Sequence, residues 1–171
     1  MIRAIVVMGV TASGKSTLGK ALAQALGWQF QEGDTLHPAA NIRKMAAGIA
    51  LNDEDRRPFL DGIAQVLTEA RSPGIVVSCS ALKRSYRDRI RAADPDALFV
   101  LPVVSRDQLQ KRLQGRAQHF MPASLLDSQL ATLEPPGADE CVLQIPGDET
   151  LDAQVQRTLT AVKLIATDAF K

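Results

Sequence analysis

The pattern best suited to chemistry lies near the amino terminus, where residues 9–16 read GVTASGKS. This segment fits G-x-x-x-x-G-K-[ST], in which glycines let backbone N–H groups turn inward around phosphate oxygens. Lys15 would reach the β- and γ-phosphates of ATP, and the Ser16 hydroxyl can ligate Mg²⁺. The motif therefore predicts an ATP site with Mg²⁺ as cofactor. The expected nucleotide-binding residues are Gly9, Val10, Thr11, Ala12, Ser13, Gly14, Lys15, Ser16 and Thr17.

A phosphate-binding loop does not identify the group that receives the phosphoryl, because GTPases, motor ATPases and small-molecule kinases share it. The sequence has no N-K-x-D guanine motif. The apolar run 75–77 is followed by Ser78, Cys79 and Ser80, where many ATPases have the acidic pair that positions water. These features favour a compact kinase. A module that binds nucleotide as a switch and transfers nothing stays open as the alternative outside the enzymes.

A second group of polar residues follows a short predicted strand at 28–31 and predicts an acceptor site. Asp34 lies at the carboxyl edge of the strand, where a carboxylate can accept a proton from an attacking hydroxyl or orient it. This group suits a polyol acid as substrate, because cationic side chains can bind its carboxylate and carboxylate or amide side chains can bind its hydroxyls. The alternative for Asp34 is a turn or cap residue, and the alternative for each of the other charged residues is a position on a solvated helix face. The expected substrate-binding residues are Asp34, His37, Arg43, Lys44, Asn52, Lys83, Tyr86, Arg87 and His119.

A third group predicts a mobile lid over residues 112–126. Arg112 and Arg116 are four residues apart and so lie on one side of a helix, and a loop follows at 118–122. Two arginines above bound phosphates would stabilise the charge in transfer and exclude water. A basic helix end, favoured by the helix dipole, is the alternative. The expected catalytic residues are Lys15, Asp34, Arg112 and Arg116.

Alternating elements must position these groups. Apolar runs at 4–8, 28–31, 75–79, 98–104 and 141–145 read as strands buried on both faces. Helical periodicity fills the gaps, with Ser105 and Thr150 as predicted caps. The sequence therefore predicts an α/β fold, a doubly wound five-stranded parallel sheet with helices on both faces, in a single domain over 1–171.

The composition of the chain bears on whether it binds nucleic acid or a membrane. The 20 Lys and Arg against 19 Asp and Glu give a net charge of +1, whereas a nucleic-acid binder usually has a clear basic excess. No apolar run approaches the roughly 20 residues of a membrane span, and we see no signal peptide. Cys79 and Cys141 each lie in an apolar run and are expected to be buried, reduced thiols. We therefore expect a cytoplasmic protein with no nucleic-acid or membrane partner.

In this order, the motifs resemble the gluconate kinase (gluconokinase) family over nearly the whole chain. The most specific are G-D-x-x-H-P at 33–38, L-N-D-x-D-R at 51–56 and C-S-A-L-K at 79–83. The resemblance implies phosphorylation of D-gluconate at the 6-hydroxyl, a fold like that of nucleoside monophosphate kinases, Mg²⁺ and a cytoplasmic homodimer. It also implies that Arg112 and Arg116 are lid arginines and that Asp34 is on the acceptor side. A related kinase for another hydroxy acid, such as shikimate, is the alternative among enzymes.

Two residues depart from the family pattern. Ala12 stands where the family often has glycine, and an alanine there would cost on the order of 1 kcal/mol if the position needed a positive φ. Gln118 replaces a frequent lid glycine, which would stiffen the lid.

Overall fold

The computed structural model describes residues 2–70, 72–115 and 124–168 of the chain. Five strands form one parallel sheet in the order β2-β3-β1-β4-β5. Each strand lies within one residue of its predicted run, so the predicted five-stranded parallel sheet is confirmed. The strands are β1 (Ala4–Met8), β2 (Gln29–Glu32), β3 (Ile75–Cys79), β4 (Leu98–Val103) and β5 (Val142–Pro146).

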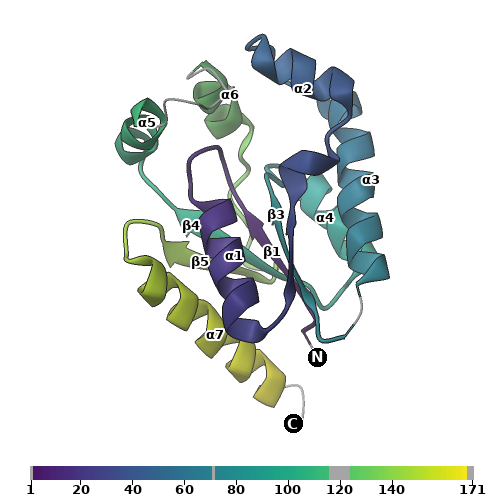
Figure 1. Ribbon diagram of the computed structural model, residues 1–171, viewed down its shortest axis with the longest axis vertical. Coiled ribbons are helices and arrows are strands. Elements are labelled where there is room, and N and C mark those ends of the chain that lie inside the picture. Colours follow the sequence, from purple (N-terminus) through teal and green to yellow (C-terminus); the bar gives the residue numbers. More distant parts are fainter. Residues whose placement is uncertain (1, 71, 116–123, 169–171) are drawn as a thin grey trace.

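Helices cover both faces of this sheet, as Figure 1 shows. On one face, α1 (Lys15–Leu26) and α7 (Leu151–Asp168) pack with Ile5, Val7 and Val76. On the other, α3 (Asp53–Glu69) and α4 (Arg84–Ala93) pack with Val6 and Val77. Neighbouring strand residues point to opposite faces, so continuous apolar runs are required when both faces are covered. The doubly wound architecture follows.

The remaining elements gather at the carboxyl end of the sheet (Figure 1). They are the 3-10 turn η1 (Gly33–Leu36), α2 (Ala39–Ala46), α5 (Arg106–Gln114) and α6 (Ser124–Thr132). The predicted caps are present, since the hydroxyl of Ser105 accepts from the Gln108 N–H at 3.3 Å and that of Thr150 from the Ala153 N–H at 3.3 Å. Helix α6 begins inside the segment predicted as the lid.

The two cysteines differ in environment. Cys79 ends a central strand and is 1% exposed, and burial raises the pKa of its thiol to about 12. Cys141 is exposed, so the expectation of a buried thiol there is wrong. The strand begins one residue later, at Val142, and lies at the edge of the sheet. Within the described ranges, no helix combines the length and apolar character that a membrane span requires.

Candidate active site

The predicted phosphate-binding loop joins β1 to α1, and its backbone has the expected left-handed positions. Gly9 and Gly14 have φ values of 130° and 94°, which glycine adopts without a Cβ clash. Ala12 has a φ of 61°, so this position does need the positive φ for which strain at an alanine was predicted. The Lys15 ammonium donates to the Val10 carbonyl oxygen at 2.8 Å, across the loop. This turn aims backbone N–H groups and the amino end of α1 at one place.

A cavity of about 260 Å³ lies against this loop. Lys15 and Ser16 line one side of it, and Asp34 and His37 line another. The structure therefore brings Asp34 and His37 to one cavity with six of the nine predicted nucleotide-binding residues, and Gly9, Val10 and Ser13 do not line it. The six are Thr11, Ala12, Gly14, Lys15, Ser16 and Thr17. Residues from the stretch 45–56 and from α6 complete its walls.

Gly33 explains why Asp34 lies at this edge. A Cβ at Gly33 would lie 1.9 Å from the Ser78 carbonyl oxygen, and the Gly33 N–H donates to the Ser78 hydroxyl at 3.1 Å. No residue with a side chain fits so close to β3. The glycine brings η1 against the neighbouring strand and presents Asp34 to the cavity. Sequence analysis missed Glu32, which also lines the cavity and accepts a hydrogen bond from the Ser78 hydroxyl.

His37 is held as a neutral ring at neutral pH. It stacks on Phe59 with ring centroids 3.8 Å apart, and the Asn41 Nδ2 atom lies 3.3 Å from its Nδ1. Burial lowers the pKa of His37 to about 4, against the opposing effect of Asp34. At neutral pH the ring can therefore exchange hydrogen bonds with substrate hydroxyls, and it is not a cation for a carboxylate.

Arg56 is the cation that sequence analysis left out of the site. It lines the cavity and is 7% exposed, and its Nε atom is buried without a hydrogen-bond partner among the described residues. Arg56, Phe59, Leu60 and Ile63 form the buried stripe of α3. A charged residue inside an apolar helical stripe was the signal that could have found it.

Three predicted substrate residues lie in a second, shallow depression beyond Leu51, which borders both hollows. Asn52 caps α3 in a reciprocal capping box with Asp55. The Lys83 ammonium lies 2.7 Å from Asp53 Oδ1, and the Tyr86 hydroxyl donates to the same carboxylate, which lowers the pKa of Asp53. The structure thus groups Asn52, Lys83 and Tyr86 together but apart from Asp34.

Two predicted substrate residues on α2 do not line the cavity. Arg43 is exposed. The Lys44 ammonium forms an ion pair with Asp55 at 2.6 Å, so it joins α2 to the start of α3.

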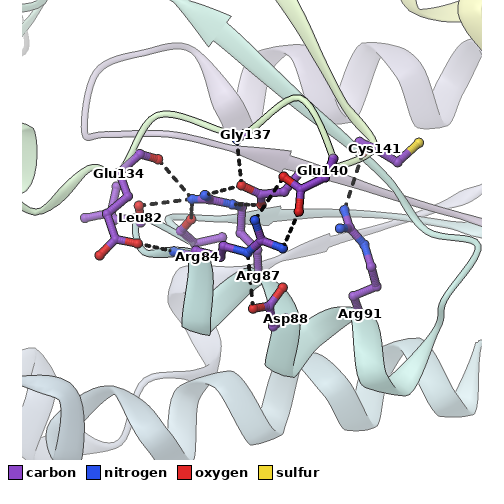
Figure 2. A network of polar contacts seen from close by, with 11 residues as sticks. Leu82, Arg84, Arg87, Asp88, Arg91, Glu134, Gly137, Glu140 and Cys141 are labelled. Carbon is purple, nitrogen blue, oxygen red and sulfur yellow. Dashed lines mark hydrogen bonds and ion pairs between the residues drawn. The ribbon is translucent and has the colours of Figure 1, made fainter.

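The structure places Arg87 in the scaffold, and Arg87 does not line the cavity. Figure 2 shows its polar contacts. It is fully buried, and its Nε and Nη2 atoms donate to the two carboxylate oxygens of Glu140 at 2.5 and 2.8 Å. Its Nη1 atom donates to the carbonyl oxygens of Leu82 and Glu134 at 3.1 and 3.2 Å. The Arg87 guanidinium lowers the pKa of Glu140 to about 2. All three guanidinium nitrogens are used, in contrast to the substrate contact predicted from sequence.

Arg112 reaches the phosphate-binding loop, and its role as a lid arginine stays a prediction. Its Nη1 atom donates to the carbonyl oxygens of Ala12 and Ser13 at 3.3 and 3.4 Å, and its Nη2 atom to that of Gly147 at 2.7 Å. The other lid predictions lie outside the described residues, namely Arg116, Gln118 and His119. Their proposed roles stay predictions.

Comparison with known proteins agrees with this arrangement. Residues 5–136 match a family model described as an AAA domain. The chain is 49% identical over 159 residues to a gluconokinase of Gluconobacter oxydans, covering 92% of this chain and 89% of that one. It superposes on the crystal structure of a gluconokinase from Sinorhizobium meliloti with a TM-score of 0.88 and 45% identity, over 98% and 95% of the two chains. A shikimate kinase from Bacteroides thetaiotaomicron shares the fold alone, with a TM-score of 0.70 and 20% identity over 94% and 98% of the two chains. The phosphate-binding loop, the acceptor edge and these matches together establish that the chain belongs to the gluconokinase family.

Proposed function

We propose that this protein is an ATP-dependent gluconokinase, which transfers the γ-phosphoryl group of ATP to the 6-hydroxyl of D-gluconate and releases 6-phospho-D-gluconate and ADP. Relatives named gluconokinase support the substrate. One observation carries the proposal: a single cavity is lined by Lys15 of the phosphate-binding loop, by Asp34 and by the buried Arg56, whose Nε atom has no hydrogen-bond partner among the described residues.

The phosphoryl donor lies on the loop side of the cavity. Lys15 and the N–H groups at the start of α1 bind and orient the phosphates, and Lys15 offsets the negative charge in transfer. P-loop kinases use ATP with a divalent metal. We propose Mg²⁺, with Ser16 as the protein ligand, to neutralise phosphate charge. Mg²⁺ usually keeps waters and phosphate oxygens and few protein ligands. A site with few protein ligands is consistent with the described residues, among which no three or more His, Cys, Asp or Glu side chains gather to hold a metal ion.

The acceptor lies on the opposite side, where the 6-hydroxyl oxygen forms a bond to the γ-phosphorus while the bond to the β–γ bridging oxygen breaks. Asp34 accepts the hydrogen bond of that hydroxyl and orients its oxygen, and the proton leaves to Asp34 or to water. Arg56 supplies a charge-assisted hydrogen bond to the gluconate carboxylate, and neutral His37 bonds a hydroxyl. The family resemblance further supports a cytoplasmic homodimer, which light scattering of the purified protein would test.

The test is ADP release in a coupled assay with each acceptor at equal concentration. We expect rapid turnover with D-gluconate and poor turnover with D-glucose, which lacks the carboxylate, and with the rigid ring of shikimate. Unpaired polar groups in such a site can cost ~10⁴-fold in kcat/KM. Nucleoside monophosphates should also fail. The Lys15→Ala variant, folded but nearly inactive, is the control for a contaminating kinase.

The outcomes separate the alternatives. Comparable rates with shikimate or a nucleotide would refute the gluconate assignment and leave a P-loop kinase. ADP release that does not depend on any acceptor would instead favour a nucleotide-binding switch.

A further inference from the structure

Helix α6 packs Leu126 in one buried cluster with Val10 and Ala12 of the phosphate-binding loop, and it also forms a hydrogen bond with this loop through Gln129. The Gln129 Oε1 atom accepts a hydrogen bond from the Thr11 backbone N–H at 2.7 Å, although the two residues are 118 positions apart in the chain. Both line the cavity. The contact therefore joins an element that begins more than a hundred residues later to the nucleotide half of the site.

The Val10–Thr11 peptide group is held at both of its polar ends. Its N–H donates to Gln129, and its carbonyl oxygen accepts from the Lys15 ammonium at 2.8 Å. The Ser13 N–H lies 3.4 Å from the same carbonyl oxygen. A rotation of this peptide would break the hydrogen bond to Gln129 and would at the same time move the Val10 carbonyl oxygen, which accepts from Lys15. The orientation of one peptide thus links the side chain of Gln129 to the position of the catalytic lysine.

We propose that Gln129 is a positioning residue for phosphoryl transfer, which fixes the Val10–Thr11 peptide and through it the Lys15 ammonium. Backbone N–H groups of such loops bind phosphate only in one orientation of their peptides. An amide side chain suits this role because it accepts the Thr11 hydrogen bond without placing a negative charge beside the phosphates. This inference rests on the proposed kinase function but does not depend on which acceptor is used.

A near-isosteric substitution tests the role. Gln129→Met keeps the length of the side chain and removes the oxygen acceptor, so the Thr11 N–H should lose its hydrogen bond to this side chain. We expect hydrogen exchange of the Thr11 amide, followed by NMR, to be about tenfold faster. Since only part of the loop population would then be competent, binding of a non-hydrolysable MgATP analogue should weaken roughly five- to tenfold. We expect kcat to fall about tenfold or more through misplacement of Lys15, with the KM for gluconate within about twofold of wild type.

Two further variants make the result decisive. Gln129→Glu keeps an acceptor oxygen, so Thr11 exchange should stay slow while the added charge weakens binding of the analogue. Gln156→Met makes the same change at an exposed position on α7 and should leave all three measurements at wild-type values.

Wild-type Thr11 exchange and wild-type kcat in Gln129→Met would overturn the proposal. Fast Thr11 exchange in Gln129→Glu would do so as well, even if Gln129→Met did not fold. Amide exchange and analogue binding involve no acceptor, so failure of the gluconate assignment would leave both readouts intact.

Discussion

Two arginines of this protein are buried in neighbouring elements and have opposite surroundings. Arg87 on α4 is fully buried with each guanidinium nitrogen hydrogen-bonded, and Figure 2 shows the loop that closes on it. Arg56 on α3 is 7% exposed, faces the cavity and has a buried Nε without a partner among the described residues. A buried charge without partners is costly to keep in a folded protein. Burial alone therefore does not separate the roles of these two arginines, whereas the hydrogen bonds of their guanidinium groups and the lining of the cavity differ between them.

The surroundings of Arg87 also explain what its ion pair holds in place. Glu140 accepts from both Arg87 and the Gly137 N–H at 2.9 Å, and the Glu134 carboxylate accepts from the Arg84 N–H at the start of α4. The bonds from Arg84 and Arg87 fasten the segment 134–140, which follows α6, to the first two turns of α4. The segment that carries Gln129 is thus anchored at its carboxyl end by a closed network.

The largest expected effect comes from removing the cation of Arg56. Arg56→Met should lower kcat/KM for D-gluconate roughly 10³-fold, because the substrate carboxylate loses its charged partner, while the KM for ATP changes little. The free energy of unfolding should change little, because the Nε atom of Arg56 has no hydrogen bond to lose within the described ranges of the chain. Steady-state kinetics and urea unfolding measure the two quantities. Arg56→Lys keeps the charge and should be intermediate, so equal activity of all three proteins would remove Arg56 from the site.

The opposite pattern is expected for Arg87. Arg87→Met leaves the Glu140 carboxylate buried without its partner and should lower the free energy of unfolding by about 3–5 kcal/mol. The KM for gluconate of the folded fraction should be unchanged. Arg89→Met is the matched control on the same helix, because Arg89 pairs with Asp61 at the surface and should cost at most about 1 kcal/mol. A large change in KM with normal stability in Arg87→Met would show that the two arginines have been assigned the wrong way round.

Acid should affect the two regions in different pH ranges. Folding lowers the pKa of His37 in the site from 6.5 to about 4, mainly through burial, and that of Glu140 in the scaffold from 4.5 to about 2, mainly through Arg87. In both cases the unfolded chain binds more protons, so stability falls as the pH falls. The contribution of His37 is present above about pH 6.5 and lost toward pH 4, and that of Glu140 is lost from pH 4.5 toward 2.

Urea unfolding between pH 8 and pH 3 would separate these contributions. His37→Gln should reduce the decline in the free energy of unfolding between pH 6.5 and pH 4 and leave the decline at lower pH unchanged. Glu140→Gln should lower the free energy of unfolding at every pH and reduce its decline below pH 4.5. Identical pH profiles in wild type and His37→Gln would contradict a neutral, buried His37.

The smallest expected effect concerns the loop itself. Ala12 has a φ of 61°, so Ala12→Gly should relieve strain and raise the free energy of unfolding by up to about 1 kcal/mol, partly offset by the greater freedom of glycine in the unfolded chain. The same substitution at exposed Ala92 on helix α4 should have the opposite sign. Thermal melts of the two variants are the measurement. If Ala12→Gly destabilises as much as Ala92→Gly, the loop carries no strain at Ala12.

Sequence reasoning reached the sheet and the phosphate-binding loop because both depend on local patterns. Runs such as Ala4–Met8 must be apolar on both faces of a covered sheet, and the loop glycines are required by backbone geometry. The roles of the arginines depend on distant partners instead. Arg87 meets Glu140 across 53 residues, and no such partner reaches the Nε of Arg56 among the described residues. Each of the two arginines lies near the start of a helix in a stretch rich in charged residues, so the sequence alone does not distinguish their roles. Cys141 was misjudged for a similar reason, because its run lies on an edge strand whose exposure depends on the strand order.

Identification of the product tests the central claim most directly. Purified protein would be incubated with MgATP and D-gluconate, and the phosphorylated product examined by mass spectrometry and by phosphorus and carbon NMR. The account predicts one equivalent of ADP for each 6-phospho-D-gluconate formed, with the phosphate on the 6-oxygen, and none with Lys15→Ala. Phosphate on another oxygen, or ADP formed without a phosphorylated sugar acid, would contradict it.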